Sequence, residues 1–295
     1  MYTQQKIINT PFGTFLKTGK VVIAGAGPGD PELITVKAAR YLQQADVVLT
    51  DRLVSGEILD QYIRPNTELI YVGKECRKGN STPQKSINEL LVHFALEGKL
   101  VIRLKGGDVS VFANILDELT VLSANNIPYE IIPGITAATG AAAYAGIPLT
   151  ARGYSTGVRF ITAYKSDVVS PSYWNELAHT NDTIVLYMSS ETLDDVVQNL
   201  MENNIGDDKL LAVIEQATTP YQHVYISSFK GYEYKLKGHR FLSPSLVIIG
   251  KVVALHEKFN WIKNNHVAKN YFNPDENQYT HNHQSENFTE HVSRA

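Results

Sequence analysis

Short apolar runs alternate with amphipathic stretches along the first half of the chain. The runs predict buried parallel strands, which we place at residues 21–24, 47–49, 69–72, 100–104 and 129–132. Apolar residues at helical spacing lie between them and predict helices, among them 84–96 and 116–124. Strands that alternate with helices form right-handed βαβ units. The first half is therefore expected to be an α/β domain with a parallel sheet.

The second half also mixes strand and helix patterns, but its strand pairing stays open. Its apolar runs predict strands at residues 158–162, 183–188, 210–214, 224–229 and 245–249, with helices between several of them, including 193–201. An alanine-rich helix over residues 134–146 ends before Pro148, near the junction of the halves. We divide the chain into an irregular leader (1–19), an N-terminal α/β domain (20–137), a C-terminal α/β domain (138–262) and a polar tail expected to be disordered (263–295).

Glycine follows several of the predicted strands in the first half. The first strand enters a Gly- and Pro-rich turn over residues 25–31, where Asp30 is expected to cap a helix that begins at Pro31. Later strands end at Gly106-Gly107 and at Gly134. Ligands of open α/β sheets bind beyond the carboxyl ends of the strands. We expect these glycines to let the backbone approach one ligand closely.

The first turn meets only half of the dinucleotide-binding pattern G-x-G-x-x-G. Gly25 and Gly27 fit, but Asp30 stands at the third glycine position and would repel a pyrophosphate. Pro28 removes one N–H that could hold phosphate. Asp51 would suit a ribose hydroxyl. An adenosine ligand without phosphate therefore fits better, and S-adenosylmethionine is the common one.

Length, charge and composition limit the kinds of partner that the sequence predicts. A length of 295 residues favours two domains, and a net charge of -3 argues against a surface that coats nucleic acid. The single cysteine, Cys76, excludes an internal disulfide and a cysteine-based zinc site. His281 and His283 could contact a metal, but a solvated tail is the favoured interpretation, so no metal site is expected. The sequence shows neither a signal-peptide core nor a membrane-spanning run, which predicts a cytoplasmic protein without a membrane partner.

Five ordered strings carry a resemblance to a known family. They are GAGPGDPELIT, ADVVLTDRLVS, YVGK, VIRLKGGD and IPGITAATGAAAYAGIPLT. In this order and spacing they resemble the tetrapyrrole methylase family, and most of all its uroporphyrinogen-III C-methyltransferase branch. The resemblance covers residues 20–262, through the closing VVALHEKFNW.

The resemblance implies two α/β domains with the active site in the cleft between them, usually in a homodimer. It implies that S-adenosylmethionine gives methyl groups to C2 and C7 of uroporphyrinogen III, forming precorrin-2 on the way to sirohaem or cobalamin. Asp51 matches the family's proton acceptor and Lys74 its proton donor. The residues that match its cofactor contacts are Pro28, Gly106, Gly107, Asp108, Val111, Thr136, Ala137, Met188 and, where the family often has glycine, Ala217.

The chemistry agrees with these residue types but leaves simpler roles open. A carboxylate at a strand end can accept the proton that leaves the macrocycle if burial raises its pKa. Asp51 could instead cap the turn that follows it, and Lys74 could only pair with a substrate carboxylate. The substrate's carboxylates call for a basic lining, for which the candidates are Arg52, Lys105 and Arg152, with Arg77 and Lys78. Arg152 is the favoured one because it closely follows Pro148-Leu149-Thr150 at the domain junction, and a guanidinium suits a carboxylate better than an ammonium group does.

The chain departs from the family on the expected substrate side. After Phe112 the family usually has a Gly-Arg-Gly segment, whereas this chain has residues 113–115, Ala-Asn-Ile. Ser189 stands where glycine is usual, and the loop after Lys74 lacks a common histidine. The favoured hypothesis is an active uroporphyrinogen-III methyltransferase. The alternatives are a methyltransferase of the same fold on another precorrin, planar or RNA substrate, a non-catalytic cofactor-binding regulator and, last, an NAD oxidoreductase.

Overall fold

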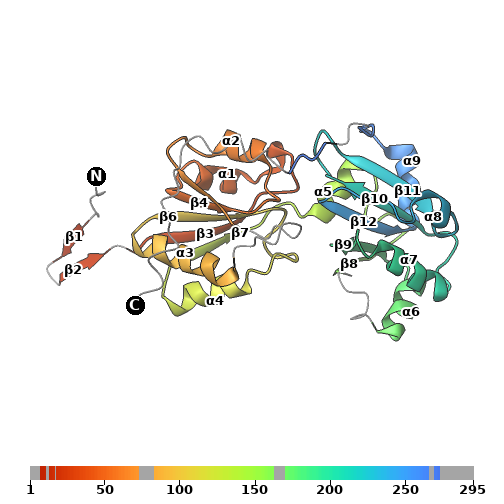
Figure 1. The fold of residues 1–295 in the computed structure, drawn as a ribbon, viewed down its shortest axis with the longest axis horizontal. Helices are drawn as coiled ribbons and strands as arrows, with labels where there is room; N and C mark the ends of the chain where they lie inside the picture. The colour runs from red at the N-terminus through yellow and green to blue at the C-terminus, as the bar shows by residue number, and fades with distance from the viewer. Residues whose placement is uncertain are drawn as a thin grey trace.

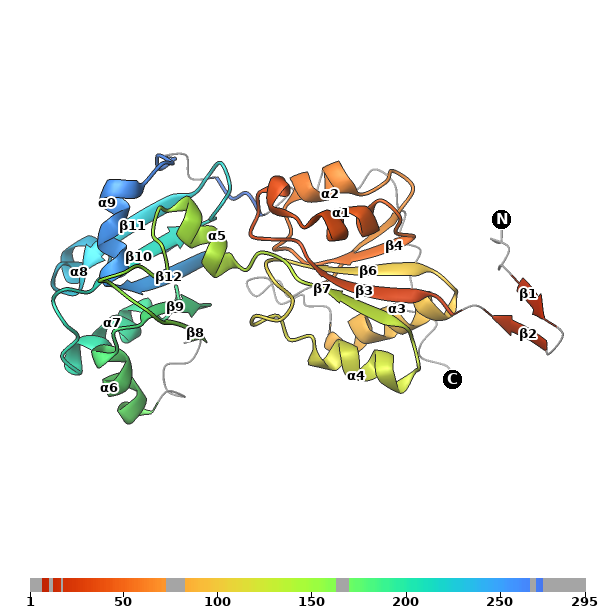
Figure 2. The same cartoon turned by 180° about the vertical axis from the view of Figure 1, so that it is seen from behind.

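The computed structural model describes residues 7–10, 13–16, 18–72, 83–162, 170–265 and 269–272. Two α/β domains lie side by side and are joined by the segment that leads into helix α5 (Ala137–Tyr144) (Figures 1 and 2). The expected fold class, two α/β domains, is confirmed. No helix in the described part of the chain is long and apolar enough to cross a bilayer.

The first domain is built on a parallel sheet, as the apolar runs predict. Its strand order is β5-β4-β6-β3-β7, and every pairing is parallel. The predicted strand positions agree with the structure to within one or two residues. The strands are β3 (Lys20–Gly25), β4 (Val47–Thr50), β5 (Glu68–Tyr71), β6 (Leu100–Lys105) and β7 (Tyr129–Ile132).

Helices cover both faces of this sheet. Helices α1 (Val36–Leu42) and α2 (Gly56–Tyr62) pack on one face, and α3 (Gln84–Leu96) and α4 (Leu116–Ala124) pack on the other (Figure 1). Side chains alternate between the two faces along each strand. Two apolar cores therefore share the central strands, which are buried except for the first residues of β3 and β6.

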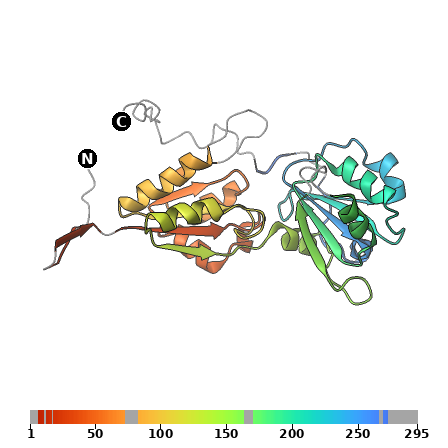
Figure 3. The same ribbon diagram turned by 90° about the horizontal axis from the view of Figure 1, so that it is seen from below.

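The second domain holds a mixed sheet of order β11-β10-β12-β9-β8, in which only β8 and β9 pair in parallel. Helices α6, α7 and α8 cover one face, and α5 with the short helix η3 covers the other (Figure 3). The strands are β8 (Val158–Thr162), β9 (Thr183–Tyr187), β10 (Leu210–Glu215), β11 (His223–Ser228) and β12 (Ser245–Gly250). The helices are α6 (Pro171–His179), α7 (Leu193–Glu202), α8 (Phe229–Lys235), η3 (Lys251–Leu255) and α9 (His256–Phe259).

The turn after β3 differs from the sequence prediction. Asp30 does act as a cap, since its Oδ1 accepts the Glu32 N–H at 2.8 Å, but the element it caps is only the 3-10 helix η1 (Pro31–Leu33). The α-helix begins at Val36, where the Thr35 hydroxyl accepts the Ala38 N–H at 3.2 Å. The predicted start at Pro31 is therefore too early.

Both ends of the chain contain order where the sequence indicated none. Strands β1 (Ile7–Thr10) and β2 (Gly13–Leu16) form an antiparallel hairpin within the predicted irregular leader, at the outer end of the first domain (Figure 1). In the predicted polar tail, the Asn264 side chain exchanges two hydrogen bonds with the Val224 backbone. Residues 269–272 also contact the second domain. The irregular leader is thus corrected to a hairpin, and part of the tail is ordered.

The ends of β3, β6 and β7 come together through glycine. A Cβ on Gly134 would lie 2.2 Å from the Gly107 carbonyl oxygen and 2.9 Å from Gly25 Cα. A Cβ on Gly25 would lie 2.7 Å from the Gly134 nitrogen. The sequence analysis expected these glycines to admit a ligand. Gly25 and Gly134 instead allow the two strand backbones to approach each other, because a Cβ at either position would clash with backbone atoms.

Replacing Gly134 with alanine is expected to lower the free energy of unfolding by about 1 to 3 kcal/mol, since the new methyl group must displace backbone. Gly231→Ala in α8 is the matched control, because its Cβ would meet only side-chain hydroxyls, the nearer at 3.1 Å. Urea unfolding of both variants measures the difference. Equal stability of the two variants would contradict the close-approach argument.

Candidate functional site

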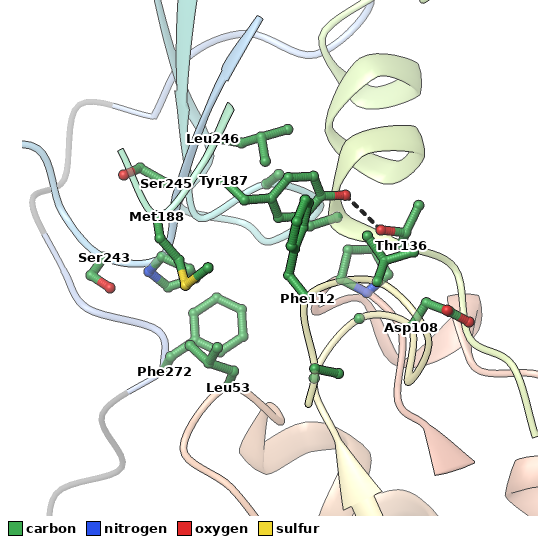
Figure 4. Close-up of a pocket in the computed structure, with 18 of the residues that line it drawn as sticks. Leu53, Asp108, Phe112, Thr136, Tyr187, Met188, Ser243, Ser245, Leu246 and Phe272 are labelled. Carbon is green, nitrogen blue, oxygen red and sulfur yellow. Dashed lines mark hydrogen bonds between the residues drawn. The ribbon is translucent and has the colours of Figure 1, made fainter. Parts of the chain in front are cut away.

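A cavity of about 360 Å³ opens between the two domains at the carboxyl edge of the first sheet. The first domain contributes the ends of β3, β4 and β6, and the second contributes the end of β9 and the start of β12 (Figure 4). This is the edge at which ligands bind in open α/β sheets. Phe112, Tyr187, Met188 and Phe272 form its bulky apolar wall.

The cavity brings together most of the predicted site residues. Asp51, Arg52 and Lys105 line it. All nine residues predicted to contact a cofactor also line it, namely Pro28, Gly106, Gly107, Asp108, Val111, Thr136, Ala137, Met188 and Ala217. The ends and following loops of six strands therefore converge on one space.

Not every predicted residue is placed at the cavity. Arg152 is exposed on the turn that follows α5 and is not among the lining residues, so its favoured place in a basic lining is not supported. Lys74, Arg77 and Lys78 lie outside the described residues. Their predicted roles remain predictions.

Asp108 ties two strand ends together. Its Oδ2 accepts the Gly134 N–H at 2.8 Å, and its Oδ1 accepts the Ser110 N–H at 2.8 Å and the Ser110 hydroxyl. The carboxylate is buried, and these donors compensate for its desolvation. Asp108 therefore shapes the floor of the cavity and holds the loop after β6 against the start of the loop after β7.

Tyr187 links β9 to the beginning of α5. Its hydroxyl oxygen accepts the Ala138 N–H at 3.1 Å and shares a 2.6 Å hydrogen bond with the Thr136 hydroxyl (Figure 4). The ring packs against Phe112 and Phe160, with ring centroids 4.9 and 5.9 Å away. Burial raises the pKa of the Tyr187 phenol, so it remains a neutral donor and acceptor at physiological pH. Tyr187 thereby positions Thr136 and Ala137 at the cavity wall.

A buried ion-pair group lies behind the basic side of the cavity. Glu118 Oε1 accepts from Arg103 Nε at 3.0 Å and from Lys105 Nζ at 3.2 Å. Burial and the neighbouring Arg103 lower the pKa of the Lys105 ammonium, while the Glu118 carboxylate opposes them. Lys105 thus faces the cavity with a carboxylate already beside it, and a substrate carboxylate would have to share that lysine with Glu118.

Asp51 follows β4 and is partly exposed in the cavity. Its Oδ1 accepts the Leu53 N–H at 3.0 Å, which closes a short turn. The turn-capping role that the sequence left open is therefore present. The carboxylate also lines the cavity, so the turn holds it where a bound ligand can contact it.

The loop after β3 holds the two domains together. The Pro28 ring packs on α5, because a Cβ on Gly140 would lie 2.6 Å from Pro28 Cγ. The Asp30 N–H donates to Thr218 Oγ1 at 3.2 Å, and the Tyr144 hydroxyl donates to Asp30 Oδ2 at 2.6 Å. Burial and this carboxylate raise the pKa of Tyr144 to about 12. Asp30 thus serves a domain contact, which the sequence analysis did not predict.

Unusual backbone conformations gather around the cavity. Phe112, Met188, Gln216 and Thr218 have φ angles of 51°, 54°, 45° and 67°. Such angles are unfavourable for residues with a Cβ and are typical of binding sites that the surrounding structure holds in place. Phe112 and Met188 line the cavity, and Gln216 and Thr218 flank Ala217, which also lines it. Sequence alone carries no signal for these conformations.

Several lining residues were not predicted. The missed ones are Gly27, Leu53, Phe112, Ala113, Tyr187, Ser190, Ile214, Ser243, Pro244, Ser245, Leu246 and Phe272. Tyr187 adjoins the predicted Met188, which is a signal that could have been used. Residues 243–246 reach the cavity only through the pairing of β12 between β9 and β10, which the sequence left open.

The lining fits the expected S-adenosylmethionine. Val111, Met188 and Leu246 offer apolar contacts for an adenosine, and the carboxylates of Asp51 and Asp108 suit a positively charged sulfonium. Ser245 Oγ is buried and has no hydrogen-bond partner among the described residues. Because an unpaired buried hydroxyl is costly, it is a natural contact for a polar ligand group.

We expect Tyr187→Phe to weaken binding of S-adenosylhomocysteine, the product form of that donor, roughly fivefold, since about 1 kcal/mol of hydrogen bonding to Thr136 and Ala138 is lost. Isothermal titration calorimetry measures the change. Tyr234→Phe is the control, because Tyr234 is 91% exposed and is not a lining residue. Equal affinities of the two variants would show that the Tyr187 hydroxyl does not position the wall.

Comparison with known proteins places these observations in one family. The sequence profile of the Tetrapyrrole (Corrin/Porphyrin) Methylases matches residues 20–231. A siroheme synthase of Vesicomyosocius okutanii is 45% identical over 245 residues, which are 83% of this chain and 52% of that protein. A siroheme synthase of Saccharophagus degradans is 45% identical over 247 residues, 84% of this chain and 54% of that protein. The chain thus spans about half the length of the curated relatives it matches.

Solved structures agree with the sequence relatives. The uroporphyrin-III-C-methyltransferase of Thermus thermophilus matches with a TM-score of 0.68 and 33% identity, over 84% of this chain and 99% of that one. A structure of that enzyme complexed with S-adenyl homocysteine matches with a TM-score of 0.66, 32% identity and coverage of 80% and 100%. A cobalt precorrin-4 methyltransferase matches with a TM-score of 0.70, 28% identity and coverage of 79% and 95%. The shared fold, the extent of the profile match and the convergence of the motifs on one cavity lead to one conclusion: the chain belongs to the tetrapyrrole (corrin/porphyrin) methylases.

Proposed function

We propose that this protein is an S-adenosylmethionine-dependent C-methyltransferase that methylates C2 and C7 of uroporphyrinogen III and forms precorrin-2. The observation that carries the proposal is the convergence of all nine predicted cofactor residues and of Asp51 on one cavity. The similarity to the Thermus thermophilus enzyme, over nearly all of that chain, supports the same substrate. Sirohaem synthesis is the favoured use, because the siroheme synthases are the similar curated relatives.

S-adenosylmethionine, once bound, supplies an activated methyl group, so the protein's main task is alignment. Tyr187 and Asp108 fix the loops that surround the cavity through the hydrogen bonds described above. Met188 and Leu246 provide apolar surface, and Ser245 Oγ offers a hydrogen bond. Pro28 and the neighbouring Asp30 leave no cradle for phosphate, which disfavours the NAD oxidoreductase alternative.

The outer part of the cavity suits a flat, apolar macrocycle. Phe112 and Met188 line the cavity and are 43% and 53% exposed. Phe160 is 37% exposed and packs edge-on against Tyr187. Exposed apolar side chains of this size, grouped at one opening, are typical of a binding surface. A tetrapyrrole can cover them while its carboxylates extend toward charged residues at the rim.

Asp51 is the residue we propose to accept the proton that leaves the macrocycle. It lines the same cavity, and the Leu53 N–H holds its Oδ1 in a fixed orientation. A positioned carboxylate is a suitable general base. Lys74 stays the predicted proton donor. Arg52 and Lys105 are the lining residues that can attract substrate carboxylates, whereas Arg77 and Lys78 stay predictions for that role.

Another precorrin is the second candidate substrate. The solved structures with this fold include enzymes named for different tetrapyrroles, cobalt precorrin-4 and uroporphyrin III. Phe112 and Ala113 line the cavity at the point where this chain lacks the family's usual Gly-Arg-Gly segment. A changed rim can change which macrocycle fits. A homodimer and a cytoplasmic location complete the proposal and rest on the family resemblance and on composition.

Anaerobic incubation with S-adenosylmethionine and uroporphyrinogen III tests the function. Mass spectrometry is expected to show a product with two added methyl groups. Asp51→Asn is expected to lower turnover about 100- to 10,000-fold, because the amide cannot take the proton but can still accept the Leu53 N–H. Asp195→Asn, an exposed aspartate on α7, is the control and should leave turnover unchanged.

The possible results separate the hypotheses. Methylation of another precorrin but not of uroporphyrinogen III would favour the second substrate. Tight binding of S-adenosylhomocysteine without turnover on any tetrapyrrole would favour a non-catalytic regulator. Full activity of Asp51→Asn would show that Asp51 only caps its turn.

A further inference from the structure

Residues 269–272, which we call the strap, lie against the second domain and contact Gln216, more than 50 positions earlier in the sequence. The Gln216 side chain holds the strap at two points: its Nε2 donates to the Lys269 carbonyl at 2.9 Å, and its Oε1 accepts the Tyr271 N–H at 2.6 Å. Gln216 is fully buried and has a φ of 45°. An unfavourable backbone conformation at a buried amide indicates that the fold is built to present this side chain.

The strap ends with its aromatic ring in the cavity wall. Phe272 is 1% exposed and is a lining residue. A Cβ on Gly29 would lie 3.0 Å from Phe272 Cζ and 2.9 Å from Thr219 Cγ2, so the ring is packed where the two domains meet. Figure 4 shows it beside Leu53 of the first domain and below Met188 of the second. The Asn270 side chain accepts the Phe272 N–H at 3.1 Å and shapes the turn before the ring.

We propose that the strap completes the methyl-donor cavity and that Phe272 is a further binding residue, forming an apolar wall against the bound S-adenosyl ligand. The inference rests on the proposed function for the identity of that ligand. Phe272 lies beyond residues 20–231, the part of the chain that the family profile matches. Gln216 is the positioning residue, since it acts on the ligand only through the strap.

The geometry favours a wall over a plug. The cavity keeps a volume of about 360 Å³ with the Phe272 ring in place. The ring is held from behind by Gly29 and Thr219, and the backbone that carries it is fixed by Gln216 and Asn270. If the ring occupied the space of the ligand, it would have to move out when the ligand binds. A ring fixed by these contacts can instead stay in place and border the bound ligand. The buried ring forms part of the cavity wall beside Leu53 and Met188.

Full-length variants test the proposal by calorimetry with S-adenosylhomocysteine. Phe272→Ala is expected to weaken binding roughly 3- to 10-fold, the loss of one aromatic contact. Phe272→Leu should recover part of that loss, because it restores apolar volume. Phe259→Ala is the matched control, since Phe259 on α9 is half exposed and is not a lining residue. Thermal unfolding without ligand checks that each variant is folded.

Variants of Gln216 provide an independent test of the proposal. Gln216→Ala should weaken binding by a similar factor, and Phe272→Ala with Gln216→Ala should be no weaker than the worse single variant, because both changes remove the same wall. In turnover, Phe272→Ala should raise KM for S-adenosylmethionine and leave kcat at saturating donor unchanged.

Each other outcome overturns the proposal. Wild-type affinity in a folded Phe272→Ala protein would show that the ring does not touch the ligand. Tighter binding would make the ring a plug. Fully additive losses in the double variant would show that Gln216 acts separately from the strap. If the wild-type protein binds no S-adenosylhomocysteine, both the proposed function and the role of the strap are contradicted. If the wild-type protein binds it and Phe272→Ala binds it equally well, only the role of the strap is contradicted.

Discussion

The site depends on the close approach of backbone at the ends of β3, β6 and β7. Gly25 and Gly134 meet with no room for a Cβ, and the Gly107 carbonyl lies against Gly134. Gly107 and Gly27 also exchange two backbone hydrogen bonds, at 3.1 and 2.7 Å. These contacts bring the loops that follow the three strands to one point. With side chains at these positions, the strand ends would separate and the loops would no longer share a cavity.

The second domain closes the cavity that the strand ends begin. Pro28 and Asp30, on the loop after β3, contact α5 and Thr218, so the loop that shapes the floor also fixes the angle between the domains. Tyr187 anchors the end of the segment that joins the domains, through Thr136 and the Ala138 N–H. The binding space is therefore a property of the interface, and neither sheet alone would form it.

Sequence reasoning succeeded where local pattern decides structure. The buried strands of the first sheet are continuous apolar runs, so strands such as β7 and helices such as α3 were predicted with their observed bounds. The short helix α2 was missed because seven residues that begin with glycine have little helix preference of their own and form only against the sheet. The pairing of the second sheet stayed open, since apolar runs do not specify their neighbours.

The residues of the candidate site also divide into those that local sequence patterns predict and those that they do not. Residues on glycine-bearing strand ends, such as Gly106 and Asp108, could be found because their motifs are local and resemble a family. Phe272 could not, because a polar stretch with an isolated Tyr-Phe pair gives no indication of the fold that receives it. The domain contact of Asp30 was missed for a related reason: its partner, Tyr144, is far away in the sequence. Long-range contacts of this kind depend on tertiary structure alone.

A crystal structure of the protein with S-adenosylhomocysteine is the most direct test of the central claim, that the space between the domains is the methyl-donor site. The account predicts ligand density bounded by Gly107 and Asp51 of the first domain and by Met188 and Ser245 of the second, with Phe272 in contact. Ligand bound elsewhere, with this cavity empty, would contradict the account.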